Sequence, residues 1–176
     1  MSAAENPEQA VLDSLATLGV DYELIKIDAE YADTAAFCEQ YDYPLEKSAN
    51  AIVIASKRGA KQYSACLALA TTRVDVNKTV RKLMGVKRVS FASAEDMAEL
   101  TGMRVGGVTP FALPAEIPLY VDARVMALDW IIVGSGGRDS KLKLAPDALR
   151  KLPNLQVIDR LAFEFLPRES ADKEGG

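Results

Sequence analysis

Two glycine-containing loops are the first places in this 176-residue sequence where chemistry could occur. They read GGVTP at residues 106–110 and GSGGRDS at residues 134–140. Glycine lets backbone amides come close to a ligand, and such amides can hold a carbonyl or ester oxygen as an oxyanion hole does. Both loops also fit ordinary turns, where glycine and proline are common. The second loop matches neither the P-loop pattern nor the dinucleotide-binding glycine pattern.

A third candidate is a basic stretch at residues 73–88, which contains six cations and one acid, Asp75. We expect a helix after Asp75, with Lys78, Arg81 and Lys82 on one exposed face because they are three or four residues apart. Such a face can contact the phosphate backbone of a nucleic acid. A solvated helix face without a partner fits the same pattern.

The amino-acid composition excludes several mechanisms. The chain has no histidine, so neither a Ser-His-Asp nor a Cys-His arrangement is possible. Its two cysteines, Cys38 and Cys66, lie far apart, match no metal-ligand spacing and are predicted to be buried thiols. We therefore predict no metal and no cofactor. A positioned lysine, backbone amides and groups of the substrate remain as means of catalysis.

Apolar periodicity and capping residues predict the elements that position these candidates. Helices are expected at 5–18, from Asp33 or Thr34 to before Pro44, at 75–84, at 93–101, after Asp122 and from Pro146. Strands are expected at 22–27, 51–56, 63–70, 88–92, 119–121, 130–133, 141–144 and 156–158. The short loop at 57–61 predicts a hairpin, and residues 103–118 form the longest irregular stretch.

This pattern predicts an α+β fold with a mixed, largely antiparallel, barrel-like sheet and helices packed outside it. A hydrophobic fraction of 49% and a charged fraction of 26% are typical of one globular domain. We place that domain at 1–166 and a polar, frayed tail at 167–176. Residues 1–8 lack the apolar core of a signal peptide, and no apolar run approaches the ~18 residues of a membrane helix. The protein is expected to be cytoplasmic, without a membrane partner.

Six short segments carry a resemblance when taken in order. They are LEKSANAIVI (45–54), VDVNK (74–78), VKRVSFAS (86–93), ELTG (99–102), GGVTP (106–110) and IVGSG (132–136). In this order they resemble the YbaK/ProX group of aminoacyl-tRNA deacylases, which also occur as editing domains attached to prolyl-tRNA synthetases. The resemblance covers about residues 34–159.

The resemblance implies a barrel-like mixed sheet wrapped by helices and hydrolysis of the ester between a wrong amino acid and its tRNA. It implies the aminoacyl-tRNA 3′ end as partner, with an aminoacyl-tRNA synthetase as a further one, and it makes Lys78, Arg81 and Lys82 the residues expected to contact tRNA. A lysine at the start of an apolar strand and a G-x-x-x-P loop define the family's site. Residues 106–110 match that loop. The residues then predicted to be catalytic there are Gly106, Gly107 and Pro110, and those predicted to bind substrate are Val108, Thr109, Ser135 and Gly136.

This sequence departs from the family pattern at the lysine. Alignment of the apolar strand places Asn50 at that position, with Lys47 three residues earlier as a displaced equivalent, so both are candidates for the catalytic role. An asparagine amide donates hydrogen bonds but brings no charge. Losing a charge-assisted hydrogen bond costs about 1.5–3 kcal/mol, or roughly 10- to 150-fold in rate. Ala112 stands where many members carry glycine.

Three hypotheses follow for the function. The first is a trans-editing deacylase in which the loop amides hold the ester carbonyl and Asn50 orients the tRNA 3′ end. The second is a non-catalytic module that binds aminoacyl-tRNA, a nucleotide or a synthetase through the same pocket. The third is a structural or assembly protein that keeps only the fold. The identity of the amino acid removed is not encoded in these patterns.

Overall fold

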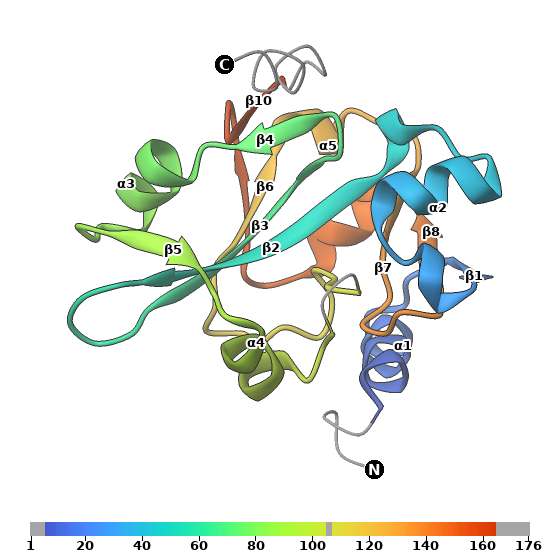
Figure 1. Cartoon of the computed structure of the whole chain (residues 1–176), viewed down its shortest axis with the longest axis horizontal. Helices are drawn as coiled ribbons and strands as arrows, with labels where there is room; N and C mark the ends of the chain where they lie inside the picture. Colours follow the sequence, from blue (N-terminus) through green and yellow to red (C-terminus); the bar gives the residue numbers. More distant parts are fainter. Residues whose placement is uncertain (1–5, 105–106, 165–176) are drawn as a thin grey trace.

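The computed structural model describes residues 6–104 and 107–164 (Figure 1). Its α-helices are α1 (Pro7–Leu18), α2 (Thr34–Tyr41), α3 (Arg81–Met84), α4 (Ala94–Thr101) and α5 (Ala123–Met126). Its strands are β1 (Glu23–Lys26), β2 (Ala49–Ser56), β3 (Tyr63–Leu69), β4 (Thr72–Val74), β5 (Val89–Phe91), β6 (Leu119–Asp122), β7 (Ile131–Gly134), β8 (Ser140–Leu144), β9 (Leu155–Ile158) and β10 (Ala162–Glu164). Single helical turns are η1 (Ala29–Tyr31), η2 (Leu45–Lys47), η3 (Val76–Val80) and η4 (Pro146–Lys151).

The described strands form three sheets, ordered β5-β2-β3-β6-β9, β1-β8-β7 and β10-β4. Pairing is antiparallel except for β3 with β6 and β6 with β9. The mixed α+β prediction is therefore confirmed. The predicted barrel-like closure is not found: between the two larger sheets the one described ladder contact is an isolated parallel bridge from Ser48 to Ile132. A single bridge leaves the edges of β7 and β5 apart, and the sheets stay open.

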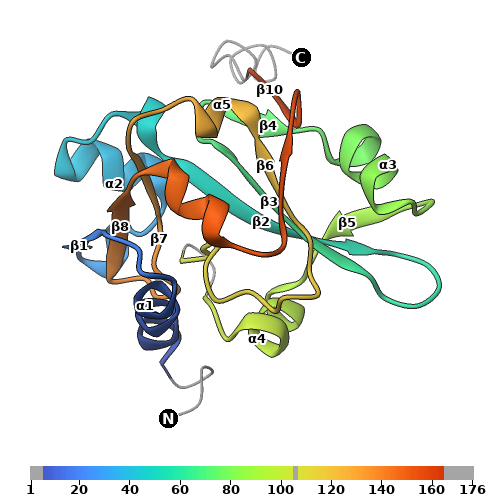
Figure 2. The ribbon, with the colours of Figure 1, turned by 180° about the vertical axis from the view of Figure 1, so that it is seen from behind.

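The β2–β3 hairpin is the longest pairing and forms where the apolar runs predict it. Its register matches Asn50 to Ala68 and Ala55 to Tyr63. Val53, Ala65 and Leu67 are buried along it. Figure 2 shows η4 and the chain leading to β10 covering the hairpin from behind, and Leu149 of η4 belongs to the same core cluster as Leu67.

Capping hydrogen bonds form at the predicted caps Ser93 and Asp122, and also at Asn6, whereas the predicted cap Asp33 makes none. The Asn6 side chain accepts from the Gln9 amide at 3.0 Å at the start of α1. The Ser93 hydroxyl does the same for the Asp96 amide at 3.0 Å at the start of α4. The predicted helix after Asp75 differs: its first residues form the π-type turn η3. The Asp75 carboxylate accepts from the Thr79 hydroxyl instead of capping a backbone amide.

Both cysteines are free and buried, as predicted. Burial raises the pKa of the Cys66 thiol to about 12, so this thiol is neutral and acts as a small apolar core residue. No helix in the described ranges is long and apolar enough to span a bilayer. The predicted tail, 167–176, lies outside the described residues.

Candidate functional site

A cavity of about 460 Å³ opens along one edge of β2. On that edge, residues 54–56 pair with β5 and Ser48 bridges to β7. On this edge the intervening residues, which pair with β3 on their other side, pair with no strand in the described part of the chain, so the cavity occupies the gap between β5 and β7. Its walls come from β2, β5, the N-terminus of α2, the start of α4, β7, β8 and Val108.

Asn50, the residue aligned with the family's lysine position, lies on the wall of this cavity. The hydroxyl of Thr34, the first residue of α2, donates to Asn50 Oδ1 at 2.6 Å. That hydrogen bond holds the amide oxygen toward α2. Asn50 Nδ2 makes no hydrogen bond to any described residue, and it is therefore the donor left for a ligand.

Lys141 of β8 lines the same cavity and was not among the predicted site residues. Its residue surface is only 6% exposed, and Nζ donates to the Ala32 carbonyl oxygen at 2.6 Å. The ammonium also lies 5.8 Å from the centre of the Phe37 ring. Burial lowers the pKa of Lys141, although the Asp33 carboxylate nearby opposes this shift.

The alternating pattern Lys141-Leu142-Lys143-Leu144 explains why Lys141 was missed. Such alternation predicts a solvated face for both lysines. Lys143 fits that expectation more closely, since it is half-buried with Nζ 4.4 Å from the centre of the Trp130 ring. Lys141 is instead covered by the chain around Ala32 and α2, a contact between segments more than 100 residues apart.

Asp33, Thr34, Asn50 and Lys141 together form what we call the polar wall of the cavity. Asp33 precedes α2, but its side chain makes no capping hydrogen bond, so its carboxylate is available at the cavity. It is the one carboxylate among the described lining residues. The remaining lining is mostly small and apolar, including Ala49, Ala51 and Val53.

The described part of the GGVTP loop packs closely against the second glycine loop. The Gly107 amide donates to the Arg104 carbonyl at 2.9 Å, and the Gly107 carbonyl accepts from the Gly136 amide at 2.6 Å. A Cβ on Gly107 would overlap the Gly137 carbonyl oxygen. Glycine is thus required at position 107 because the backbone there packs directly against the backbone of the second glycine loop. Gly106 lies outside the described residues.

Other residues of this loop divide between the cavity and the core. Val108 lines the cavity. Thr109 is fully buried, and its hydroxyl has no hydrogen-bond partner in the described structure. Pro110 lines a different pocket, beside Leu18 and Leu113. The structure therefore brings Val108 to Asn50 but leaves Thr109 and Pro110 behind it.

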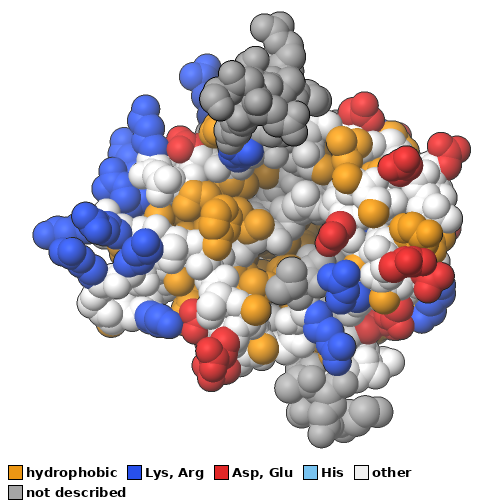
Figure 3. Space-filling model, viewed as in Figure 1, with side chains coloured by type: hydrophobic (Ala, Val, Ile, Leu, Met, Phe, Trp, Pro, Cys, Tyr) orange, Lys and Arg blue, Asp and Glu red, His pale blue; other side chains and the backbone are white. Residues whose placement is uncertain are grey.

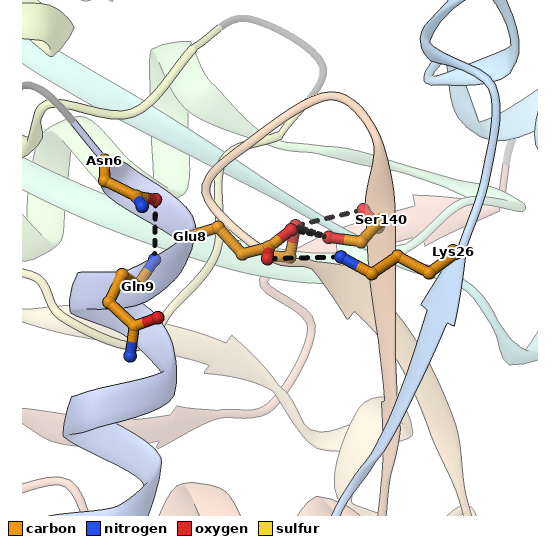
Figure 4. A network of polar contacts seen from close by, with 6 residues as sticks. Asn6, Glu8, Gln9, Lys26 and Ser140 are labelled. Atoms are coloured by element: carbon orange, nitrogen blue, oxygen red, sulfur yellow. Dashed lines mark hydrogen bonds and ion pairs between the residues drawn. The ribbon is translucent and has the colours of Figure 1, made fainter.

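The second glycine loop is held by α1. The Ser135 hydroxyl bonds with the Ser140 hydroxyl at 2.7 Å, and Ser140 donates to Glu8, which also pairs with Lys26 at 3.5 Å (Figure 4). Gly136 has φ +94°, and a Cβ there would meet the Pro7 carbonyl. Ser135 and Gly136 thus anchor the loop to α1. Gly134 is the residue of this loop that lines the cavity.

The remaining predicted residues lie away from the cavity. Lys47 forms an ion pair with Asp129 and has Nζ 5.1 Å from the centre of the Trp130 ring. Its hydrogen bond lowers the pKa of the exposed Asp129. Lys78, Arg81 and Lys82 are exposed on η3 and α3, beyond β5.

The fold is that of a known group of solved structures. The chain superposes with a TM-score of 0.74, at 21% identity, on a crystal structure provisionally described as a trans-editing enzyme for prolyl-tRNA synthetase. The superposition covers 90% of this chain and 97% of that one. At this identity the likeness establishes the fold.

Sequence comparison identifies the family. Residues 28–152 match the model of the aminoacyl-tRNA editing domain, and the chain belongs to that family. It is 32% identical over 82 residues to EbsC of Enterococcus faecalis, provisionally named a Cys-tRNA(Pro)/Cys-tRNA(Cys) deacylase. That match spans 47% of this chain and half of EbsC. A proline–tRNA ligase of Bacillus licheniformis is 37% identical over 60 residues, 34% of this chain and 10% of the ligase.

Proposed function

We propose that this protein hydrolyses the ester bond of mischarged aminoacyl-tRNA, with the cavity beside β2 as the site. The observation that carries the proposal is the orientation of Asn50. Because Thr34 occupies the amide oxygen, Nδ2 is left to donate to a carbonyl or hydroxyl oxygen of the aminoacylated ribose. Membership of the aminoacyl-tRNA editing family supports the choice of substrate.

Lys141 supplies the positive charge that Asn50 lacks. Its ammonium lies on the same polar wall, in a cavity lined mainly by apolar residues. A charge in such surroundings is poorly screened, so it stabilises negative charge developing on the ester oxygen more strongly than a solvated lysine would. Keeping a lysine buried is costly, and that cost is typical of functional sites.

Asp33 complements the other charged group of the substrate. An aminoacyl ester has a free α-ammonium, and Asp33 supplies the carboxylate of the polar wall. The Gly107 amide is already bonded to Arg104, so among the described residues of the GGVTP loop we assign the carbonyl-facing role to the Val108 backbone. Proton transfer falls to water or to a substrate hydroxyl, since the chain has no histidine.

The test is release of amino acid from a panel of mischarged tRNAs. Wild type should release at least one amino acid faster than buffer, and Asn50→Ala should release it more slowly. Asn50→Lys should hydrolyse faster than wild type, because it adds a charge-assisted hydrogen bond at this position. No release above buffer by the wild type or Asn50→Lys, with both folded, would contradict the proposal.

A second candidate is binding without turnover, and the uncharged Asn50 favours it. Under this hypothesis the cavity binds a non-hydrolysable aminoacyl-adenosine analogue saturably, while no ester is cleaved. An aminoacyl-tRNA synthetase is a further partner for either function. Calorimetric titration of the analogue into wild type and Asn50→Ala distinguishes binding at this cavity from binding elsewhere.

A further inference from the structure

Charge is divided unevenly across the face that contains the cavity. Figure 3 shows lysine and arginine side chains gathered where Figure 1 has α3 and β5, while most acidic side chains in view lie on the opposite side, toward α2. The whole chain has a formal charge of −4. A polyanion is therefore repelled by the molecule as a whole and attracted to this one side.

Four cations on that side converge on a depression of about 340 Å³, which we call the cationic depression. Lys57 directly follows β2, Arg81 lies in α3, and Lys87 and Arg88 lie in the segment before β5. The Lys57 amide donates to the Arg88 carbonyl at 3.0 Å, which ties two of these segments together. Convergence from three segments distinguishes this depression from a solvated face of one helix.

The cations of the depression are not neutralised by neighbours. Its described lining contains no carboxylate, and none of the four cations forms an ion pair with a described residue. Asn77 also lines it, and its carbonyl accepts from Arg81 Nε at 2.9 Å, which fixes the guanidinium. Such an array binds phosphate groups.

Phe91 connects this depression to the cavity. It ends β5, three residues after Arg88, and it lines the cavity mouth while 64% exposed. Among the described large hydrophobic residues it is the most exposed. At 3.3 Å per strand residue, about 10 Å separates Phe91 from Arg88 along the chain. An exposed aromatic ring beside an unpaired cationic surface is the arrangement on which single-stranded nucleic acids stack.

We propose that the terminal base of the tRNA 3′ end stacks on Phe91 while phosphates of the preceding nucleotides bind in the cationic depression. The single strand then approaches over β5, and its aminoacylated ribose reaches the cavity from that side. This inference rests on the proposed function for the identity of the ligand. It assigns to Phe91, Lys57, Lys87 and Arg88 a role in holding the substrate.

The first experiment measures binding of uncharged single-stranded RNA ending in the tRNA 3′ sequence, by fluorescence anisotropy at low salt. Phe91→Ala should weaken binding about 5- to 150-fold, the range for removal of one stacked base. Phe91→Trp should retain it. Phe163→Ala removes another exposed ring, 49% exposed on β10, and should leave binding unchanged. Absent RNA binding by wild type, or equal losses for Phe91→Ala and Phe163→Ala, overturns the proposal.

The second experiment measures the salt dependence of the same binding. Lys87→Gln and Arg88→Gln should each reduce the slope of log K against log salt by about 0.7, the value for one phosphate contact on a single strand. Lys26→Gln and Arg150→Gln remove exposed cations far from the depression and should leave the slope unchanged. Equal slopes in all four variants contradict a phosphate site here.

Failure of this inference can be told apart from failure of the proposed function. The RNA probe carries no ester, so its binding through Phe91 does not depend on hydrolysis. If hydrolysis occurs, Phe91→Ala should raise KM for aminoacyl-tRNA by a larger factor than it raises KM for a small aminoacyl ester that has no terminal base. Hydrolysis of aminoacyl-tRNA with an unchanged KM in Phe91→Ala refutes the stacking role and leaves the proposed function intact.

Discussion

The polar wall and the two glycine loops (residues 107–110 and 134–140) border the same cavity and use their polar groups differently. In the loops, the Gly107 and Gly136 amides donate to carbonyls of the protein itself, and the Ser135 hydroxyl bonds to Ser140. On the polar wall, Asn50 keeps a donor directed away from Thr34, and Asp33 caps no helix. Glycine content therefore marks where backbone packs against backbone. Apart from the Val108 backbone, the groups suited to a ligand are side chains of the polar wall.

The largest expected effect is the loss of stability on Gly134→Ala. A Cβ there would overlap the carbonyls of Val108 and Gly107, and backbone cannot move aside as a side chain can. We expect the free energy of unfolding, measured in urea, to fall by about 3 kcal/mol.

Gly137→Ala is the matched control in the same loop, since its Cβ would lie at ordinary contact distance, 3.4 Å from Asp139 Oδ1. It should change stability by less than about 1 kcal/mol. Equal stability of the two variants would contradict the claim that close backbone packing requires glycine at position 134.

The second-largest expected effect is a loss of catalytic rate on Lys141→Met. Methionine fills a similar space without the charge, so kcat for aminoacyl-tRNA hydrolysis should fall about 10- to 150-fold. Wild-type kcat should also decrease as the pH rises through the lowered pKa of Lys141, because the ammonium loses its proton, and this limb should vanish in the variant. Lys143→Met, on the same strand, should keep both the wild-type kcat and its decrease at high pH.

The same lysine predicts a pH dependence of stability. Between its lowered pKa in the folded protein and its ordinary pKa near 10.5, the unfolded chain holds the proton and the folded chain does not. The free energy of unfolding therefore rises with pH in this window. Wild type should gain stability relative to Lys141→Met as the pH is raised across it, and a constant difference would mean that Lys141 titrates normally.

A smaller effect is expected from Thr34→Val, which keeps the side-chain shape and removes the hydroxyl that orients Asn50. One neutral hydrogen bond contributes about 0.5–1.5 kcal/mol, so kcat should fall about 2- to 10-fold. Thr34→Ser should retain activity. If valine and serine behave alike, the orientation of Asn50 does not matter, and the polar wall loses its distinguishing feature.

The smallest expected effect concerns Ala112, the second residue after the first glycine loop. Ala112 has φ +63°, in the left-handed region that favours glycine, the residue that the family pattern leads one to expect there. Ala112→Gly should raise the free energy of unfolding by about 0.5 kcal/mol, since relief of strain exceeds the added entropy of the unfolded chain. Ala98→Gly, inside α4, should lower it by about 1 kcal/mol.

Much of the fold could be predicted from sequence because its signals are local. The β2–β3 hairpin, the Ser93 cap and the glycine stops after α1, α3 and α4 each depend on a few neighbouring residues. Strands β4 and β10 were missed, since each has three residues and is paired only with the other. The open sheets were also missed, because closure depends on contacts between distant strands.

The sequence alone determined the absence of imidazole chemistry, the family resemblance and the placement of Asn50 at the position of the family's lysine. Tertiary structure alone decided what surrounds Asn50. Lys141 is 91 residues away along the chain, and a lysine in an alternating strand is buried only if another segment covers it, as α2 does here. The cationic depression likewise needs three segments to meet. Chemistry carried by one residue type can be predicted from sequence, whereas chemistry that depends on shared burial and charge requires the fold.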